Sequence, residues 1–144
     1  MSIWQQPVDC AQLNQRGKGT LSEHLDIKYT AVEESALVAI MPVDQRTVQP
    51  LGILNGGASC ALAESVGSAA ANFCVTTDHY CVGLDINANH IKPATAGFVT
   101  ATARPIHLGK RTQVWQIIIE QQHNTVCICR LTCLVCAKEK PHKK

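Results

Sequence analysis

Residues 55–72 read NGGASCALAESVGSAAAN and consist almost entirely of small side chains. Glycine, alanine and serine let other backbone approach closely, which predicts a tightly packed, largely buried helix that we place at residues 57–76. Its one charged side chain is Glu64, the only Asp, Glu, Lys, Arg or His between Thr47 and Thr77. Burying an unpaired carboxylate is costly, so we expect Glu64 to serve chemistry. The alternative is a Glu that hydrogen-bonds backbone at a packing or dimer contact.

The pattern around this helix predicts a sheet. Residues 7–17 begin with a proline and end with a glycine, as short helices do. Alternating or apolar runs predict strands at 25–32, 36–43, 81–91, 97–107, 111–120 and 125–137. Their short connections favour an α+β domain, with an antiparallel sheet wrapped around one long central helix. We expect one domain over residues 1–137 and a basic, disordered tail at 138–144.

Within the strand at 81–91, strict alternation places His90 on the same face as Val82, Leu84, Ile86 and Ala88. A histidine in that register is either a core side chain or part of a site.

Composition limits the partners. The chain has 144 residues and a net charge of +2, enough for one core and without a broad basic face for nucleic acid. Its first residues lack the charged start and apolar segment of a secretory signal, and no run approaches the roughly 18 apolar residues of a membrane helix. We therefore expect a soluble, cytoplasmic protein that binds neither nucleic acid nor membrane.

The eight cysteines do not have the spacing of a metal or disulfide framework. Cys133 and Cys136 form a C-x-x-C pair, but in a strand residues three apart point to opposite faces. Cys127, Cys129 and Cys133 share one face, which predicts packing as small hydrophobes. A metal or redox role is the alternative.

Gly56 and Gly57 precede the helix and leave backbone N–H groups at its positive end. Such an end can bind the oxygen of a carbonyl. Glu64 lies about two turns further on, and Ser68 one turn beyond it on the same stripe. A carboxylate that attacks a polarised carbonyl, or activates a water that does so, makes acyl transfer feasible.

Two segments, PVDQRTVQPLGILNGGASCALAESVGSAA and VGLDINANHIKPATAGFVTATARPIHLGKRTQVWQIII, resemble the hotdog-fold thioesterases that hydrolyse acyl- and aryl-CoA. The resemblance covers about residues 20–136 and is strongest to the bacterial branch with the menaquinone-pathway 1,4-dihydroxy-2-naphthoyl-CoA thioesterase and the enterobactin-pathway proofreading thioesterase. It implies the fold already predicted from periodicity. It also implies a homodimer or homotetramer with shared sites, and no cofactor, because coenzyme A is part of the substrate.

The resemblance assigns roles to five residues. Glu64 is implied as nucleophile or general base, and Ser68 as its assistant. Gln49 is implied to bind the thioester or position water, and the Gly57 N–H to bind the thioester carbonyl. His90 is implied to line the entrance to the site.

One position departs from the family pattern, because Asn55 stands where close relatives have His. An Asn amide can donate a hydrogen bond but cannot titrate, so we expect retained activity at altered efficiency. The alternatives are a protein that binds acyl-CoA without hydrolysing it, and, less compatible with this helix, a hotdog dehydratase.

Residues 104–111, RPIHLGKR, gather basic groups around a glycine turn that suits the phosphates of coenzyme A. The resemblance makes His107, Gly109 and Arg111 the candidates for substrate binding. A solvated hairpin turn is the alternative.

Overall fold

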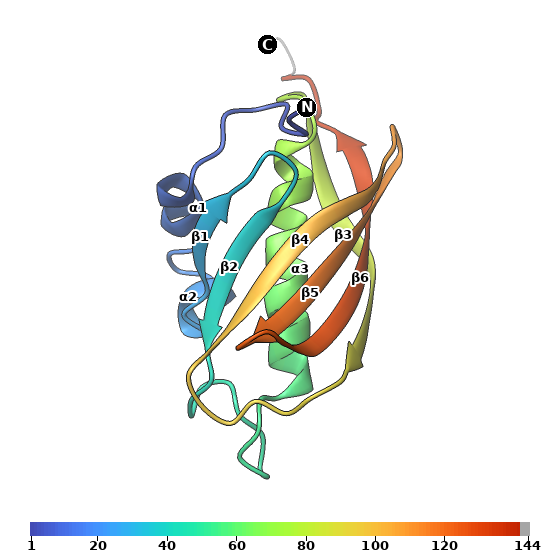
Figure 1. Cartoon of the computed structure of the whole chain (residues 1–144). Coiled ribbons are helices and arrows are strands. Elements are labelled where there is room, and N and C mark those ends of the chain that lie inside the picture. Colours follow the sequence, from blue (N-terminus) through green and yellow to red (C-terminus); the bar gives the residue numbers. More distant parts are fainter. Residues whose placement is uncertain (142–144) are drawn as a thin grey trace.

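The computed structural model describes residues 1–141 as one sheet and a long helix, with two short helices near the N-terminus (Figure 1). In chain order the elements are α1 (Cys10–Arg16), α2 (Leu21–His24), β1 (Lys28–Val32), β2 (Leu37–Pro42), α3 (Gly56–Phe73), β3 (His79–His90), β4 (Phe98–Leu108), β5 (Thr112–Gln121) and β6 (Asn124–Ala137).

The six strands form one antiparallel sheet in the order β1-β2-β4-β5-β6-β3. The sheet curves around α3, which contacts β2 to β6 (Figure 1). This confirms the predicted α+β hotdog arrangement. Strands β1 and β3 are its edges, so one side of β3 has no neighbouring strand within the described chain.

The small residues of α3 are required by its close approach to the sheet. The inward side of α3 includes Leu62, Val66 and Gly67, all buried. A Cβ added to Gly67 would lie only 2.7 Å from Leu131 Cδ2 and 3.2 Å from Ile117 Cδ1. Larger side chains there would force the helix off the sheet, because cores are close-packed.

Only one side of α3 is buried in this way. The other side is half-buried and consists of Cys60, Ala61, Glu64, Ser65, Ser68, Ala69 and Asn72. The predicted burial of the helix is therefore complete on one side of α3 and partial on the other within a single chain. Glu64 lies on this open side of α3.

A β-bulge between Gly83 and Asp85 changes the faces predicted for β3. Beyond the bulge, Ile86 and Ala88 pack against the core as expected. Before it, Cys81 is the buried residue, while Val82 and Leu84 are 42% and 57% exposed. Strict alternation was wrong for Val82 and Leu84, because one extra residue shifts the side-chain period.

The remaining sequence expectations concern boundaries and cysteines. Helix α1 begins after Asp9, whose Oδ1 accepts the Gln12 N–H at 2.8 Å, and α2 was not anticipated. Cys127, Cys129 and Cys133 are buried, which confirms their packing role.

Lys138, expected in the free tail, is instead anchored: its N–H donates to Asp78 O and its Nζ to Thr77 O. The last part of the predicted tail, 142–144, lies outside the described residues. Among residues 1–141, no helix is long and apolar enough to span a membrane.

Candidate active site

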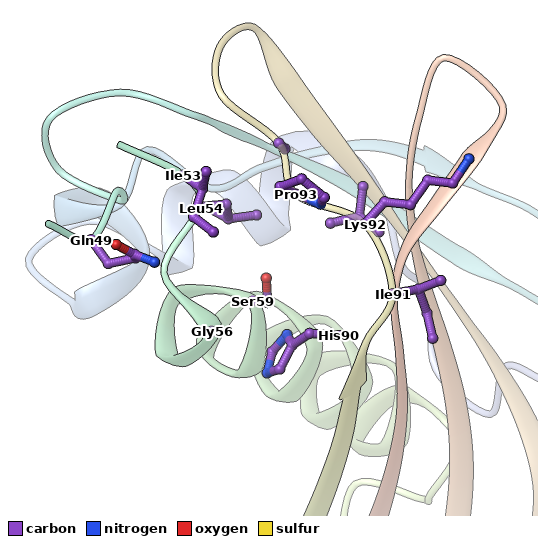
Figure 2. A pocket seen from close by; sticks show the side chains of 11 residues that line it. Gln49, Ile53, Leu54, Gly56, Ser59, His90, Ile91, Lys92 and Pro93 are labelled. Carbon is purple, nitrogen blue, oxygen red and sulfur yellow. The ribbon is translucent and has the colours of Figure 1, made fainter. Parts of the chain in front are cut away.

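A cavity of about 410 Å³ opens at the N-terminal end of α3 (Figure 2). It lies between the loop before α3 and the segment after β3, and its apolar wall consists of Ile53, Leu54, Ile91, Pro93, Ala94 and Val126. Two residues predicted for the site, Gln49 and His90, line the cavity, and so does Gly56, the neighbour of the predicted Gly57. The cavity volume is typical of small-molecule sites.

His90 is exposed and stacks closely on Gly56, where an added Cβ would lie 2.8 Å from His90 Nε2. Glycine is therefore needed at Gly56 for this approach. A core role for His90 is wrong, and its place in the cavity wall agrees with the predicted entrance residue.

Asn55 is the N-cap of α3, and its Oδ1 accepts the Gly57 N–H at 2.7 Å. The Gly57 amide, expected to be free for a carbonyl, is therefore occupied in this structure. The Asn55 Nδ2 group makes no hydrogen bond with any residue between 1 and 141. Asn55 can consequently hold the helix end with its oxygen and offer its amide N–H groups to a ligand.

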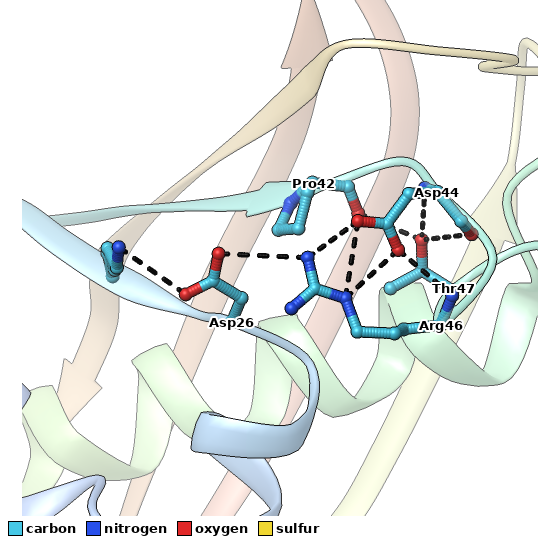
Figure 3. Close-up of polar contacts among 6 residues, drawn as sticks. Asp26, Pro42, Asp44, Arg46 and Thr47 are labelled. Carbon is cyan, nitrogen blue, oxygen red and sulfur yellow. Dashed lines mark hydrogen bonds and ion pairs between the residues drawn. The ribbon is translucent and has the colours of Figure 1, made fainter.

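The loop that carries Gln49 and Asn55 is fixed at its base by Thr47 (Figure 3). Thr47 is 1% exposed, and its hydroxyl donates to Pro42 O at 2.8 Å and accepts the Asp44 N–H at 3.1 Å. Its carbonyl accepts the Asn55 N–H at 2.8 Å. The buried Thr47 thus joins the end of β2, through its side chain, to the N-cap residue of α3, through its backbone carbonyl.

Arg46 links the same loop to the start of β1 (Figure 3). It binds Asp44 at 2.6 Å and approaches Asp26 at 3.8 Å. Hydrogen bonds from the Arg46 side chain and amide hold the pKa of Asp44 below its ordinary value. Arg46 is exposed and the two aspartates are half-buried, so these surface ion pairs add little to stability.

Glu64 lies over the edge strand, with its carboxylate against Gly83. A Cβ on Gly83 would overlap Glu64 Oε1 well inside van der Waals contact. The Cys133 thiol is close by: burial raises its pKa to about 11 and the Glu64 charge adds to the rise, while a hydrogen bond with Ser68 opposes it. Cys60 has a raised pKa for the same two reasons, burial and Glu64. Both thiols therefore stay protonated at neutral pH, whereas the role of Glu64 as nucleophile or general base is a prediction from sequence.

Asn72 joins β3 to the side of α3 that carries Glu64 and Ser68. Its Oδ1 accepts the Cys81 N–H at 2.9 Å, and its Nδ2 donates to Cys81 O at 3.0 Å and to Ser68 O at 2.8 Å. The Asn72 amide thereby pairs with both backbone groups of Cys81, as a residue of a neighbouring strand would. Gly83, two residues further along β3, is fixed beneath Glu64 as a result.

The structure divides the predicted residues between two places. Gln49, Gly56 and His90 line the cavity, whereas Glu64 is not among its lining residues. Glu64 lies seven positions after Gly57, about 10 Å along a helix axis. Attack on a carbonyl requires about 3–3.5 Å, so Glu64 cannot reach a carbonyl bound at the N-terminus of its own helix.

The basic turn lies at the other end of α3. Gly109 and Lys110 line a separate pocket with Cys74, Val75 and His79, beyond the C-terminal end of α3. His107, Gly109 and Arg111 are therefore not brought to the cavity within one chain.

Sequence reasoning missed Thr47, Ser59, Asn72 and Gly83. Ser59 is 1% exposed and lines the cavity. Of the four, only Asn72 had a signal, because it continues the stripe of Glu64 and Ser68 by another four residues.

Comparisons with known proteins agree on one family. The model of the Thioesterase superfamily matches residues 51–128. A Vibrio cholerae protein provisionally named an esterase is 57% identical over 136 residues, 94% of this chain and 91% of that protein. The Escherichia coli 1,4-dihydroxy-2-naphthoyl-CoA hydrolase is 45% identical over 131 residues, 90% of this chain and 96% of the hydrolase. A crystal structure of a mutant Pseudomonas aeruginosa thioesterase has a TM-score of 0.92 and 47% identity, and the match covers 94% of this chain and 99% of that one.

Thr47→Val should destabilise the fold by about 1–3 kcal/mol, because the substitution keeps the shape but leaves the buried Pro42 O and Asp44 N–H without their partner. Urea unfolding measures this change in the free energy of unfolding. Thr77→Val, at an exposed threonine, is the matched control and should stay within about 0.5 kcal/mol. Equal stabilities for the two variants would contradict the role of Thr47.

Gly83→Ala should lower thioester hydrolysis about 100-fold while the protein stays folded, because its Cβ displaces the Glu64 carboxylate by about 1 Å. Gly83 is not among the described residues with positive φ, so alanine suits its backbone. Turnover of a thioester and the melting temperature are the two measurements.

The control is the same substitution made together with Glu64→Ala. With no carboxylate to displace, Gly83→Ala should lower the residual rate no further. A large loss in both backgrounds would mean that Gly83 acts through the strand instead of through Glu64.

Proposed function

The chain belongs to the thioesterase superfamily, and from that membership we propose that it hydrolyses acyl- or aryl-CoA thioesters with Glu64 as nucleophile or general base. The observation that carries the proposal is the position of Glu64. It is the one charged side chain of α3, lies on the open side of the helix, and is flanked by two thiols that stay protonated.

The chemistry needs a polarised carbonyl and a base. Attack by water activated by Glu64 adds oxygen to the carbonyl carbon and breaks the C–S bond, and the departing thiolate of coenzyme A takes up a proton. Direct attack by Glu64 would form an acyl–enzyme anhydride that water then opens. Both routes end in the free acid and coenzyme A, and neither needs a metal or other cofactor.

Asn55 is the proposed donor to the thioester carbonyl. Its Oδ1 accepts the Gly57 N–H, and its Nδ2 has no partner within the described part of the chain, so Asn in place of the family's His keeps a hydrogen-bond donor at the helix end. The Gln49 Oε1 accepts the Leu51 N–H, and its amide nitrogen has no hydrogen-bond partner among residues 1–141, which leaves it to position water or the thioester.

We propose that each site is completed by a second copy of the chain. One chain would supply Gln49 and His90 from the cavity and Asn55 from the adjacent end of α3, and its partner would supply Glu64 and Ser68. The distance along α3 supports this, because the two groups are too far apart within one helix to act on one carbonyl. The half-buried side of α3 has only small residues around Glu64, which suits close packing against another helix.

The proposal covers substrates with either an aryl or an alkyl acyl group. The Escherichia coli relative is named for 1,4-dihydroxy-2-naphthoyl-CoA, which makes that thioester the first to assay here. A place in menaquinone synthesis would follow only from its hydrolysis.

The basic turn at residues 104–111 can bind the phosphates of coenzyme A only if two or more chains assemble around each site. His107, Gly109 and Arg111 lie near the C-terminal end of α3, so they would bind phosphates of a substrate held mainly by another chain.

A second candidate is a protein that binds acyl-CoA without hydrolysing it. The hydrogen bond from the Gly57 N–H to Asn55 favours this candidate, because it removes the amide that the family pattern assigns to the carbonyl. Such a protein would bind thioesters and release no thiol.

Glu64→Gln should abolish thiol release while thioester binding persists, because the amide keeps the shape of the carboxylate and cannot act as a base. Thiol release from aryl-CoA, medium-chain acyl-CoA and acyl-carrier-protein thioesters measures this directly. Glu23→Gln, at an exposed glutamate in α2, is the control and should hydrolyse normally. Full activity of Glu64→Gln would exclude the proposed mechanism, and a wild type that binds without releasing thiol would favour the second candidate.

Asn55→Asp separates the two functions of Asn55, because aspartate keeps the oxygen that caps Gly57 and loses the Nδ2 donor. We expect unchanged thermal stability and a loss of turnover of about 100-fold or more. Asn55→His should retain or raise turnover. If Asn55→Asp is as active as wild type, Asn55 serves only as a cap.

Mixing Glu64→Gln and Asn55→Asp chains tests the shared site. In a dimer that contains one chain of each, one of the two sites is intact, so about a quarter of the wild-type rate should return on random mixing. No recovery, with mixed dimers shown by mass spectrometry, would place the whole site in one chain.

A further inference from the structure

A second cavity, of about 210 Å³, lies between the N-terminal helices α1 and α2, which sit beside β1, and the C-terminal half of α3 (Figure 1). Its wall on α3 begins at Ala69, ten positions beyond Ser59 and about 15 Å further along the helix axis. Strand β1 is also the sheet edge opposite to β3, which carries Gly83 and His90. This cavity is therefore separate from the candidate active site of the same chain.

Arg16 is the one charged residue in the lining of this cavity, which we call the Arg16 cavity. Its guanidinium carbon lies over the Phe73 ring, 5.0 Å from the ring centroid. Stacking occupies a face of the guanidinium and leaves the N–H groups in its plane able to donate. Within residues 1–141, the Arg16 side chain forms no ion pair and no hydrogen bond. A positively charged donor therefore remains for a ligand.

Covering Phe73 does not explain this choice of residue. Phe73 is only 2% exposed, and the apolar stem of any long side chain, such as lysine, could cover its ring. A guanidinium differs in presenting parallel N–H groups, which bind a carboxylate through two hydrogen bonds at once.

The other polar side chains of the lining are mostly engaged. The Tyr29 hydroxyl donates to a carbonyl of α3 at 3.1 Å, and the Thr20 hydroxyl donates to the C-cap carbonyl of α1 at 2.6 Å. The Asn72 amide donates to two backbone carbonyls at 2.8 and 3.0 Å. Arg16 and the half-buried hydroxyl of Ser22 are thus the side-chain donors left to a ligand. A group that binds here must accept hydrogen bonds, and a negative charge would strengthen them.

The rest of the lining indicates the body of the ligand. Leu13, Ala69 and Phe73 give the cavity an apolar wall from two helices, and no residue of the lining is acidic. Inorganic phosphate carries more than one negative charge at neutral pH, and the lining has no second cation to balance it. A single carboxylate attached to a small apolar group matches both the one charge and the wall.

We propose that the Arg16 cavity is a second ligand site, which binds a small apolar monocarboxylate with its carboxylate on Arg16 and its apolar group against Leu13 and Ala69. The cavity and its charge carry this proposal without reference to catalysis. The likely source of the ligand rests on the proposed thioesterase function, because hydrolysis of an acyl or aryl thioester releases an acid of this class. The site would then bind the product class away from Glu64.

The test uses benzoate as the probe and two-dimensional NMR of the ¹⁵N-labelled chain to locate it. We expect saturable shifts of the amides at residues 13–22 and 69–73. Arg16→Gln should weaken this binding about tenfold or more, because a charge-assisted pair of hydrogen bonds is lost. Benzamide keeps the shape of benzoate without its charge, so it should not shift these amides.

Two further variants separate the cavity from general effects of charge and fold. Lys18→Gln removes the same charge two positions away and outside the lining, so it should keep the dissociation constant of benzoate within about twofold. Ala69→Leu fills the apolar wall and keeps Arg16, so it should abolish the shifts at residues 13–22. The spectra of both variants also show whether the chain stays folded.

Several results would overturn the proposal. Equal affinity of wild type and Arg16→Gln for benzoate would show that Arg16 does not hold the carboxylate. Equal binding of benzamide would mean that charge is irrelevant. Displacement of benzoate from residues 13–22 by equimolar inorganic phosphate would make this a phosphate site. Shifts confined to residues 53–57 and 90–94 would place benzoate only in the cavity at the other end of α3.

The same measurements are independent of the hydrolysis mechanism. A chain that releases no thiol from any thioester, yet binds benzoate through Arg16, would contradict the proposed function and support this site. Normal hydrolysis without benzoate binding at residues 13–22 would overturn this site alone.

Discussion

The close approach of α3 to the curved sheet is the constraint on which the rest of the structure depends. Gly67 has no room for a Cβ against Leu131 and Ile117, and Ala63, Ala70 and Ala71 are fully buried on the same helix. A helix so close to the sheet buries its inward side in the core of one chain. Its other side is left with small residues and one carboxylate, and that asymmetry places Glu64 where chemistry is feasible.

The position of Glu64 depends on the edge strand as much as on the helix. Asn72 pairs with the backbone of Cys81 and fixes β3, the bulge after Gly83 turns Val82 and Leu84 outward, and Gly83 leaves space for the carboxylate. At the other end, Thr47 ties the preceding loop to Asn55 and so sets the mouth of the cavity. These polar contacts join residues five to nine positions apart across the ends of elements, and none repeats with a helical or strand period.

Much of the fold followed from sequence because its signals are local. The alternation of β1, β2, β4, β5 and β6 and the small residues of α3 each reflect one element facing one core. The roles of Glu64 and His90 were inferred from their settings within such elements and from resemblance. Asn55 was recognised as unusual, but its bond to the Gly57 N–H depends on a side-chain rotamer that sequence does not specify. Ser59 had no signal, because a serine in a helix of small residues is unremarkable until a cavity lies next to it.

The sequence by itself determined that this chain has a long helix of small residues with one carboxylate, surrounded by six strands, because side-chain size and periodicity act within each element. The tertiary structure alone decided which residues share a site. It brought Gln49, Gly56, Ser59 and His90 to one cavity, placed Glu64 about 10 Å further along α3, and moved the basic turn to the opposite end. These distances arise from the curvature of the sheet, the bulge in β3 and the loop before α3, which involve contacts between distant segments that no local pattern encodes.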